Sequence, residues 1–471
     1  MSSPRRTIPI ASAVAVEPAQ HVYARSSSGP FTRARLALAL LTQLFFFGMP
    51  WVQYDGRQAV LFDLAHQRFY FFGTLLLPQD LIYLTGLLIA SAMLLFLATV
   101  LFGRVWCGFA CPQTVYTALF MGIERRMEGD RSARMRLNQS PWGLNKLLRR
   151  GGKHLVWALL ALWTGLSFVG WFTPIRELVQ GLPSLSMGPW NTFWVLFYAG
   201  VTYLHAGVLR ERICQHACPY GRFQSAMLDR NTLVVTYDQA RGEPRGRRSA
   251  AAQASAAPVG DCVDCTLCVQ VCPTGIDIRQ GLQSACISCG VCIDACNGVM
   301  DKLKQPRGLI RFAPLQAGAQ GLAQQLRKPR VWVYGGAILG VLVLMAVGLW
   351  QRPELRLDAH RDRGVMARMV SGGQVENVYR LQIRSASMQP QTLDIRVQPA
   401  GEAPAASLQL VAGDAQPVIE PAGTLNLPVT VRMPAEQAYA LRGQTVPIQF
   451  EISGAGGLHQ VQASSTFLVP R

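Results

Sequence analysis

Eight of the twelve cysteines of this chain lie in one stretch that begins at Cys262 and ends at Cys296. They form two blocks with the same spacing, C-x2-C-x2-C-x3-C, followed by Pro273 after the first block and Asn297 after the second. In such a run three thiolates wrap one iron–sulfur cube, while the fourth reaches a second cube. Zinc sites instead use two separate pairs of cysteines, each with C-x2–4-C spacing. The spacing therefore predicts a bacterial-type ferredoxin domain with two [4Fe–4S] clusters, rather than zinc knuckles or a disulfide framework.

The shared-ligand pattern of two-cluster ferredoxins also predicts which sulfurs hold which cluster. We expect the first cluster on Cys262, Cys265, Cys268 and Cys296, and the second on Cys272, Cys286, Cys289 and Cys292. These eight cysteines are the predicted metal ligands of the chain.

Long apolar stretches predict that the chain crosses a membrane. Half of the residues are hydrophobic, yet the formal net charge is +18, a combination that suggests apolar spans with basic flanks. Buried core helices rarely run so long without a charge. We therefore predict five spans, at about 36–52, 81–102, 155–173, 190–209 and 331–350.

The distribution of lysine and arginine predicts the orientation of these spans. Residues 1–35, 103–153 and 210–330 carry 5, 10 and 16 of them, whereas residues 53–80 and 174–189 carry 2 and 1. Basic segments remain in the cytoplasm, so the N-terminus and the cysteine block are expected inside and residues 351–471 in the periplasm. Cysteines kept reduced as ligands fit the same side. The positive charge then follows from this topology and from attraction to anionic lipid headgroups. We therefore expect no nucleic-acid partner.

The remaining cysteines form two C-x3-C-P motifs, each directly after a predicted span. Cys107 and Cys111 lie in VWCGFACPQTVY, and Cys214 and Cys218 lie in ERICQHACPYGRFQ. Proline is favoured as the first residue inside a helix, so the second cysteine of each motif is expected to cap a new helix. Two thiolate pairs at one membrane depth suit a Cu(I) site, a dithiol/disulfide relay or another thiolate site. The alternative is a structural role, in which the small cysteine side chains only allow the helices to pack closely. We treat these four as redox or copper candidates.

Two histidines near these motifs have no role that the sequence settles. His205, within the fourth span, is a conceivable haem or copper ligand, but polar residues in spans more often hydrogen-bond to a neighbouring helix. His216 lies inside the second motif.

The residues outside these motifs predict the remaining domains. Residues 351–471 alternate apolar and polar residues between Gly and Pro turns, which predicts some seven strands of an immunoglobulin-like sandwich, either a docking module or a passive cap. The expected order is a disordered cytoplasmic tail (1–35), a four-span membrane domain (36–230), a basic linker (231–260), the ferredoxin domain (261–310), a fifth transmembrane helix (331–350) and the sandwich (351–471). The predicted fold class is a multi-domain membrane protein: a five-helix transmembrane bundle with an inserted α+β ferredoxin domain and a C-terminal β-sandwich.

Together these motifs resemble the FixG/RdxA/CcoG family, the accessory proteins for assembly of cbb3-type cytochrome c oxidase. The resemblance rests on DGRQAVLFDLAHQRFYFFG, GRVWCGFACPQTVY, CPYGRFQSAMLDRNTLVVTYD and VCPTGIDIRQGLQ. It implies a polyferredoxin of the bacterial inner membrane that reduces Cu(II) to Cu(I) for insertion into the oxidase, as a cupric reductase. It also implies copper as a further metal, oxidase subunits and copper chaperones or transporters as partners, and a cytoplasmic electron donor that the sequence leaves unidentified.

Two other functions remain open at this point. The C-x3-C-P pairs and two cubes also resemble maturation proteins of nitrate and nitrous oxide reductases, which predicts a membrane conduit from quinol to a periplasmic reductase. A non-catalytic assembly scaffold, with clusters that serve only the fold, is the third hypothesis.

Overall fold

The structure is a computed structural model that describes residues 22–184, 186–229, 231–246, 260–314, 326–362, 367–400, 407–412, 416–454 and 460–471. It divides into two compact units. The ferredoxin unit comprises Met1–Phe47, Ala92–Phe168 and Met187–Ala337, and the sandwich unit comprises Gly48–Ser91, Val169–Ser186 and Ile338–Arg471.

Five helices in the described part of the chain are long and apolar enough to cross a membrane: Pro30–Trp51, Pro78–Phe102, Leu144–Val169, Pro189–Leu209 and Pro329–Trp350. Their α-helical portions are α1 (Pro30–Gly48), α2 (Leu81–Phe102), α6 (Leu144–Val169), α8 (Pro189–Thr202) and α15 (Pro329–Trp350). α8 continues as the π-helix η3 (Tyr203–Leu209). α15 buries none of its residues, as expected for a helix whose surface faces lipid.

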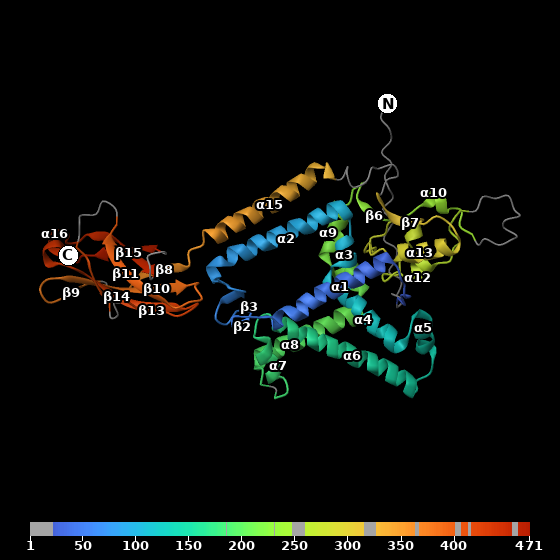
Figure 1. Cartoon of the computed structure of the whole chain (residues 1–471), viewed down its shortest axis with the longest axis horizontal. Helices are drawn as coiled ribbons and strands as arrows, with labels where there is room; N and C mark the ends of the chain where they lie inside the picture. The colour runs from blue at the N-terminus through green and yellow to red at the C-terminus, as the bar shows by residue number, and fades with distance from the viewer. Residues whose placement is uncertain are drawn as a thin grey trace, which may run out of the picture. The chain divides into compact units, whose positions relative to one another are not determined.

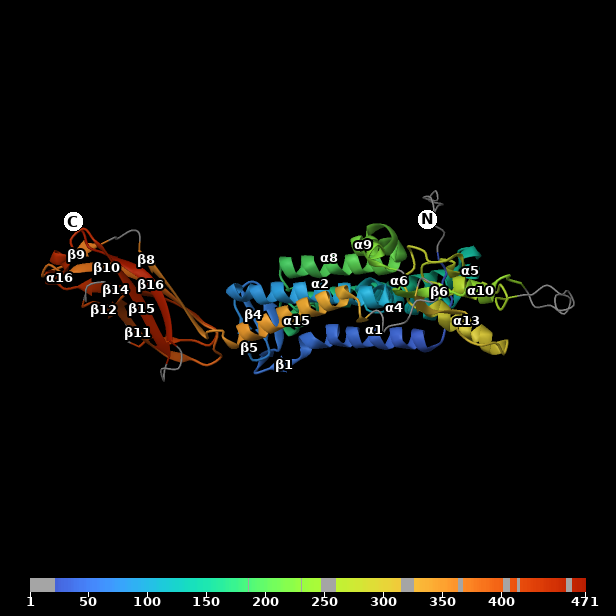
Figure 2. The same cartoon turned by 90° about the horizontal axis from the view of Figure 1, so that it is seen from above.

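Helices α2 and α15 run side by side (Figure 2). The rings of Phe96 and Tyr334 lie 6.3 Å apart, and a Cβ added to Gly86 would lie 2.8 Å from Met345 Sδ. Such close approach at a small residue is the usual way in which helices associate in lipid, where van der Waals packing replaces the hydrophobic effect.

α6 begins at Leu144, whereas the predicted span begins near residue 155. The first turns of the helix contain basic residues, so their low hydropathy leaves them outside the predicted span. The Lys146 ammonium donates to the carbonyl of Asn138 at 3.0 Å, and Lys153 Nζ lies 2.7 Å from Glu128 Oε1. Both lysines are buried. Glu128 compensates the charge of Lys153, whereas the Lys146 ammonium is satisfied by neutral backbone carbonyls.

The tail also differs from its prediction where the structure describes it. Residues 1–21 lie outside the described residues, but residues 22–35 are held in place: the Arg25 N–H donates to Gln270 O at 2.8 Å, and the Thr32 N–H donates to Asp294 Oδ2 at 2.7 Å. α1 begins within this segment, at Pro30.

The cysteine block is flanked in sequence by two strands that lie beside its helices (Figure 1). β6 (Leu233–Tyr237) pairs antiparallel with β7 (Ile310–Pro314), and the core that these strands share with α13 contains Val235, Ile293 and Met300. The intervening elements are α10 (Gln239–Gly242), α12 (Leu267–Gln270), η5 (Ile278–Gln280) and α13 (Val291–Lys302). The predicted linker 231–260 thus supplies β6, whose LVVTY sequence has high strand propensity, and α10; residues 247–259 lie outside the described residues.

The membrane-edge part of the ferredoxin unit contains further short helices. They are α3 (Val105–Phe109), α4 (Pro112–Glu128), α5 (Arg131–Gln139), the π-helix η4 (Ile213–Ala217) and α9 (Pro219–Met227). α3 and α4 follow α2 without a long loop, and η4 and α9 follow η3, so both C-x3-C-P motifs lie at the ends of spans.

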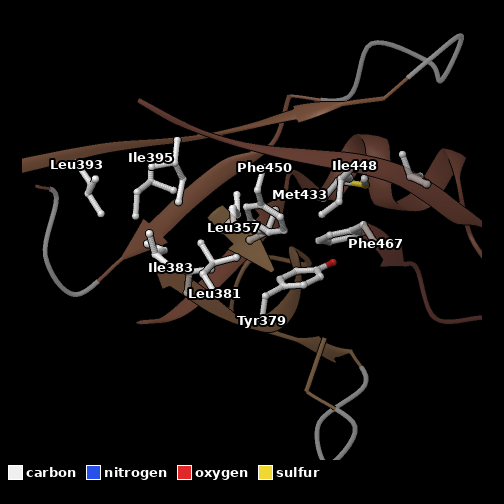
Figure 3. Packing of buried hydrophobic residues seen from close by; sticks show 14 of the residues in the cluster. Leu357, Tyr379, Leu381, Ile383, Leu393, Ile395, Met433, Ile448, Phe450 and Phe467 are labelled. Carbon is white, nitrogen blue, oxygen red and sulfur yellow. The ribbon is translucent and has the colours of Figure 1, made fainter. Parts of the chain in front are cut away.

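In the sandwich unit, residues 355–471 form two packed sheets. One has the order β12-β14-β10-β8 with β9 beside β10, and the other has the order β13-β11-β15-β16. The strands are β8 (Leu355–Arg361), β9 (Arg368–Met369), β10 (Val375–Ser385), β11 (Gln391–Pro399), β12 (Gln409–Ala412), β13 (Val418–Ile419), β14 (Thr424–Met433), β15 (Thr445–Gly454) and β16 (Gln460–Leu468), with α16 (Ala435–Ala440) before β15. Figure 3 shows the side chains between the sheets, where Tyr379 and Phe450 pack at a ring separation of 5.1 Å. The predicted immunoglobulin-like sandwich is confirmed.

A small meander follows the first span and packs on the sandwich within the same unit. Its elements are η1 (Met49–Trp51), β1 (Gln53–Tyr54), β2 (Arg57–Gln58), β3 (Val60–Asp63), β4 (Arg68–Phe71), β5 (Thr74–Leu76) and η2 (Pro78–Asp80), with α7 (Ile175–Gly181) from the second outer loop. Leu75 and Leu77 are buried with Ala422 of the sandwich. The buried carboxylate of Asp80 lies 2.7 Å from both Arg352 and Arg356, so the end of η2 is joined to β8 and to the residues between α15 and β8.

We predict that Asp80→Ala destabilises the sandwich unit by about 3 kcal/mol, because two guanidinium groups then lose a buried partner. The measurement is thermal unfolding of the full chain in detergent. Asp394→Ala is the matched control, since Asp394 and Arg396 form an exposed pair at 2.8 Å that contributes about 0–1 kcal/mol. Equal melting temperatures for the two variants would contradict the prediction.

Candidate functional site: two cysteine clusters and a membrane-edge set

The two ferredoxin cysteine blocks share a backbone conformation. Asp264 and Thr266 flank Cys265 with φ of 51° and 56°, and Ser288 and Gly290 flank Cys289 with φ of 51° and 73°. A left-handed backbone is costly for a β-branched residue such as Thr266, and strain of this kind persists where the surrounding structure enforces it. Each block is therefore bent into the same tight loop, as ligands wrapped around one cube require.

The structure gathers the cysteines into two cavities. One is lined by Cys262, Cys265, Cys268 and Cys296, and the other by Cys272, Cys286, Cys289 and Cys292 together with Cys268. Among the described residues that line them, neither cavity has a carboxylate or an imidazole. An all-thiol set fits iron–sulfur clusters. Cys268 lines both cavities, and the assignment of individual cysteines to each cluster stays a prediction.

Burial dominates the electrostatics of these thiols. It raises the pKa of Cys268 and Cys286 to about 11 and that of Cys296 to about 12. A thiol must lose its proton to bind metal. The buried sulfurs are therefore protonated at neutral pH unless a metal takes the place of the proton.

The C-x3-C-P cysteines, which we call the membrane-edge cysteines, occupy equivalent places in the two motifs. Cys111 is the N-cap of α4 and Cys218 the N-cap of α9, each with Pro as the first helical residue, which confirms the predicted caps. Cys107 lies in α3 and Cys214 in η4. The two cysteines of a motif thus belong to different helices, joined by a sharp turn.

Side-chain contacts bring the two motifs together. The Cys107 thiol donates to Gln224 Oε1 on α9 at 3.4 Å, and Gln224 is fully buried. Gln113, two residues after Cys111, donates to the carbonyls of His205 and Arg210, both at 3.0 Å.

The electrostatics of the thiols agree with this convergence. Burial raises the pKa of Cys107 to about 12, with smaller contributions from Cys111, Cys214 and Cys218. It raises the pKa of Cys214 to about 11, with contributions from Cys111 and Cys218. Cys107 and Cys214 therefore each lie within electrostatic reach of the other three membrane-edge sulfurs.

The first motif packs directly against the second ferredoxin cavity. Cys107 lies against the buried cluster of Ile287, Cys289 and Val291. A Cβ added to Gly108 would lie 2.7 Å from Ile287 O and 2.9 Å from Cys289 Cα, so only glycine allows this approach.

Two arginines support the same contact. Arg104 donates to the carbonyls of Cys286, at 3.1 Å, and Ser284, and also to that of Gly221, at 3.3 Å. Arg35 Nε donates to Gly108 O at 2.9 Å. Arg104 therefore ties the ferredoxin loop to both motifs.

A buried charge cluster holds the turn that leads to Cys214. Glu124 on α4 pairs with Arg134 at 2.8 Å, Arg210 at 3.2 Å and Lys153 at 3.6 Å. Arg210 links η3 to η4 with a φ of 46°, and its guanidinium lies over the ring of Trp157 at 5.4 Å.

Neither His205 nor His216 places its ring in the contacts described above. The backbone carbonyl of His205, not its ring, takes part in the contacts above, and His216 is exposed. In the described ranges no three His, Cys, Asp or Glu side chains converge closely enough to hold a single metal ion.

A cavity of about 190 Å³ lies beside the membrane-edge cysteines. Cys214, Gly108, Gln113 and Glu211 line it on one side, and Ile287 and Pro273 of the cysteine block line it on another. Sequence reasoning did not single out Gly108, Gln113, Gln224 or Glu124; of these only Gly108, a glycine inside a cysteine motif, offered a signal.

We predict that Gly108→Ala lowers both the iron content and the unfolding midpoint, because the added methyl forces the Cys289 loop away at a cost of about 1–3 kcal/mol. Gly122→Ala on α4 is the control, since its Cβ meets nothing within 4 Å and alanine favours the helix. Wild-type iron content and stability in the Gly108 variant would contradict this packing.

We predict that Glu124→Gln destabilises the ferredoxin unit by about 3–5 kcal/mol, because three buried cations then lose their shared anion. Chemical unfolding followed by tryptophan fluorescence, with Trp157 next to the cluster, measures it. Asp301→Asn, which breaks the exposed Arg307 pair, should leave the midpoint unchanged. A Glu124 variant as stable as the wild type would show that the cluster does not hold this turn.

Family models match three parts of the chain. A "4Fe-4S binding domain" matches residues 84–128, a "4Fe-4S dicluster domain" matches residues 209–314, and the model described as "IG-like fold at C-terminal of FixG" matches residues 345–470. The first contains Cys107 and Cys111, and the second contains the other ten cysteines.

The chain is also similar to two curated proteins over nearly its whole length. It is 37% identical to nitrogen fixation protein FixG of Rhizobium meliloti, with 90% of each chain covered. It is 38% identical to protein RdxA of Cereibacter sphaeroides, with 93% of this chain and 95% of that protein covered. A crystal structure of a FixG-related protein from Vibrio parahaemolyticus covers 25% of this chain and 97% of its own, at 20% identity and a TM-score of 0.21. The chain has enough ferredoxin cysteines for two clusters, five apolar helices and the C-terminal sandwich. It belongs to the FixG/RdxA family of iron–sulfur electron-transfer proteins.

Proposed function

We propose that this chain is a membrane-bound cupric reductase that assists assembly of cbb3-type cytochrome c oxidase by converting Cu(II) to Cu(I) for insertion. Its family and its iron–sulfur domains establish electron transfer as the general role. The resemblance of its motifs to oxidase accessory proteins, and the soft thiols at the membrane edge, support copper as the acceptor.

The observation that carries the proposal is the contact between Cys107 and the Cys289 loop. Iron–sulfur clusters, when bound, supply one-electron oxidation and reduction. Reduction of Cu(II) to Cu(I) needs one electron, which a reduced carrier in the cytoplasm would provide. The short separation at Gly108 keeps the membrane-edge cysteines beside the ferredoxin ligands.

The residues around this contact hold the site in place. Arg104 fixes the loop of Cys286 to α9 through backbone carbonyls, and Gln224 holds the Cys107 thiol. Thiolates stabilise Cu(I) over Cu(II). The membrane-edge cysteines therefore act either as copper ligands or as the holders of a redox group that copper meets.

The topology that fits this role has the ferredoxin ligands in the cytoplasm, the sandwich in the periplasm and five spans in the bacterial inner membrane. The excess of Lys and Arg in residues 103–153 and 210–330 supports it. The sandwich would dock oxidase subunits or copper carriers, because it stands as a folded domain with its own core.

A conduit from quinol to a periplasmic reductase is the second candidate. The 190 Å³ cavity between α1, α4 and the cysteine block favours it, as a place for a small membrane-derived donor. Residues 351–471 contain no cysteine, however, and so offer no thiolate for a periplasmic cluster.

A non-catalytic scaffold would require clusters that stay oxidised at physiological potentials, which a redox titration measures.

We predict that anaerobically purified, iron-loaded protein, reduced with limiting dithionite and freed of excess, yields about one chelated Cu(I) per stored electron when mixed with Cu(II). Cys107→Ser and Cys214→Ser should each slow this reduction about 10- to 100-fold.

The matched controls are Ala110→Ser and Ala217→Ser, the residues that precede Cys111 and Cys218. Unchanged rates in the cysteine variants would remove the membrane-edge site from the reaction. Activity that appears only with a reduced quinol as donor would favour the conduit.

A further inference from the structure

We propose that residues 302–311 form a docking surface for an acidic one-electron carrier protein of the cytoplasm, which delivers electrons at Cys265. This inference rests on the electron-transfer role proposed above and specifies where electrons enter the chain. The transfer forms and breaks no bond: the carrier loses one electron, and the iron–sulfur group that Cys265 would help to hold gains it. We call residues 302–311 the docking segment.

The first support is the exposure of a single cysteine. Cys265 is the one exposed cysteine of the twelve, all of which belong to the described residues. It lines the cavity that also contains Cys262, Cys268 and Cys296. Electron transfer between two proteins slows steeply as the donor and acceptor groups move apart. A carrier therefore has to approach where a ligand of the acceptor group reaches the surface.

The membrane-edge contact involves the other cysteine block. Cys107 packs against Cys289 of the second block, whereas Cys265 belongs to the first. Cys268 lines both ferredoxin cavities and so connects the two blocks. A carrier at Cys265 therefore leaves the contact at Cys107 undisturbed, and the electron can pass from the first block through the second to the membrane edge.

The second support is the location of the docking segment. It runs from the last residue of α13 through a turn into β7 (Figure 1). Leu309 and Ile310, within the segment, are buried and line the same cavity as Cys265. The exposed residues of the segment therefore border the cavity at which the carrier would deliver its electron.

Hydrogen bonds give the docking segment a fixed shape. The Gly308 N–H donates to Asn297 Oδ1 at 3.0 Å, and the Arg241 guanidinium donates to the carbonyl of Arg307 at 3.1 Å. Asn297 directly follows the second cysteine block, where Pro273 follows the first. The residue that departs from the repeated pattern thus supplies the acceptor that holds this turn.

The third support is the charge of the docking segment. It contains four basic residues and no acidic one, and all four are exposed: Lys302, Lys304, Arg307 and Arg311. The two arginine side chains, each paired with an aspartate, are 68% and 53% exposed, whereas their aspartate partners are 45% and 24% exposed. Among the described residues no carboxylate forms a salt bridge with either lysine. The segment therefore presents positive charge to the solvent.

The acidic residues around Cys265 only partly offset this charge. Asp264 and Asp277 share the guanidinium of Arg279, which leaves one net negative charge in that group against the two charges of the unpaired lysines. Complementary charge steers encounter and selects the partner. The surface next to Cys265 therefore favours a carrier with an acidic face.

The test uses the full iron-loaded chain in detergent and an acidic plant-type [2Fe–2S] ferredoxin as the probe. Calorimetric titration should show binding whose dissociation constant rises about tenfold between about 50 and about 200 mM salt, because salt screens exposed charges. Stopped-flow mixing with the reduced ferredoxin should bleach the iron–sulfur absorbance of the oxidised chain. Bound ferredoxin should also protect Lys302 and Lys304 from acetylation, as read by mass spectrometry.

Lys302→Gln/Lys304→Gln should weaken binding and slow this bleaching about 5- to 10-fold, since two steering charges are lost, with wild-type iron content. The matched control is Arg126→Gln/Arg149→Gln, which removes two exposed positive charges from α4 and α6 and should leave both values unchanged. Equal affinities in the two variants would overturn the docking surface, and so would preferential binding of cytochrome c, a basic carrier.

Two further outcomes separate the alternatives. Acetylation of the two lysines that phosphatidylglycerol nanodiscs block and ferredoxin does not would overturn the proposal in favour of a surface that contacts anionic lipid. A chain that ferredoxin docks on and reduces, but that does not reduce Cu(II), would refute the proposed function and leave this inference standing. Cu(II) reduction by a dithionite-reduced chain that binds no ferredoxin would refute this inference alone.

Discussion

The contact between the Gly108 turn and the Cys289 loop is the constraint on which the rest of the site depends. A glycine is required because any side chain would meet the backbone of Ile287 and Cys289. The arginine that precedes this turn, Arg104, donates to the carbonyl of Cys286 in the ferredoxin loop and to that of Gly221 on α9. As a result, cysteines from two distant parts of the sequence lie in one buried cluster. A ferredoxin domain tethered by flexible linkers alone would not have this proximity, and electron transfer depends on it.

The second motif is held by a different kind of interaction. Three cations surround the carboxylate of Glu124 in a buried cluster, and one of them, Arg210, adopts the left-handed turn between two π-helices. π-Helical segments are rare and occur often at functional sites. Here they bring the chain out of the fourth span and direct Cys214 towards the first motif. The charge cluster thus stabilises the segment that leads to Cys214.

Much of this organisation could be predicted from the sequence, because it depends on local patterns. The cysteine spacing indicated the iron–sulfur domain, the Pro after Cys111 and Cys218 indicated helix caps, and the alternation in residues 351–471 indicated the sandwich. The convergence of the C-x3-C-P motifs could not be predicted, since it arises from long-range packing through Gln224 and Gln113. The early start of α6 was missed for a related reason: Lys146 and Lys153 find their partners only in the folded protein.

The central claim is that electrons from the iron–sulfur clusters, which the ferredoxin cysteines would hold, reach copper at the membrane edge. Rapid-freeze electron paramagnetic resonance tests it most directly, with reduced protein mixed with Cu(II) and frozen at successive times. The account predicts that the Cu(II) signal and the reduced iron–sulfur signal disappear together, with the same rate constant and equal numbers of spins. A Cu(II) signal that persists while the iron–sulfur signal stays reduced would contradict it.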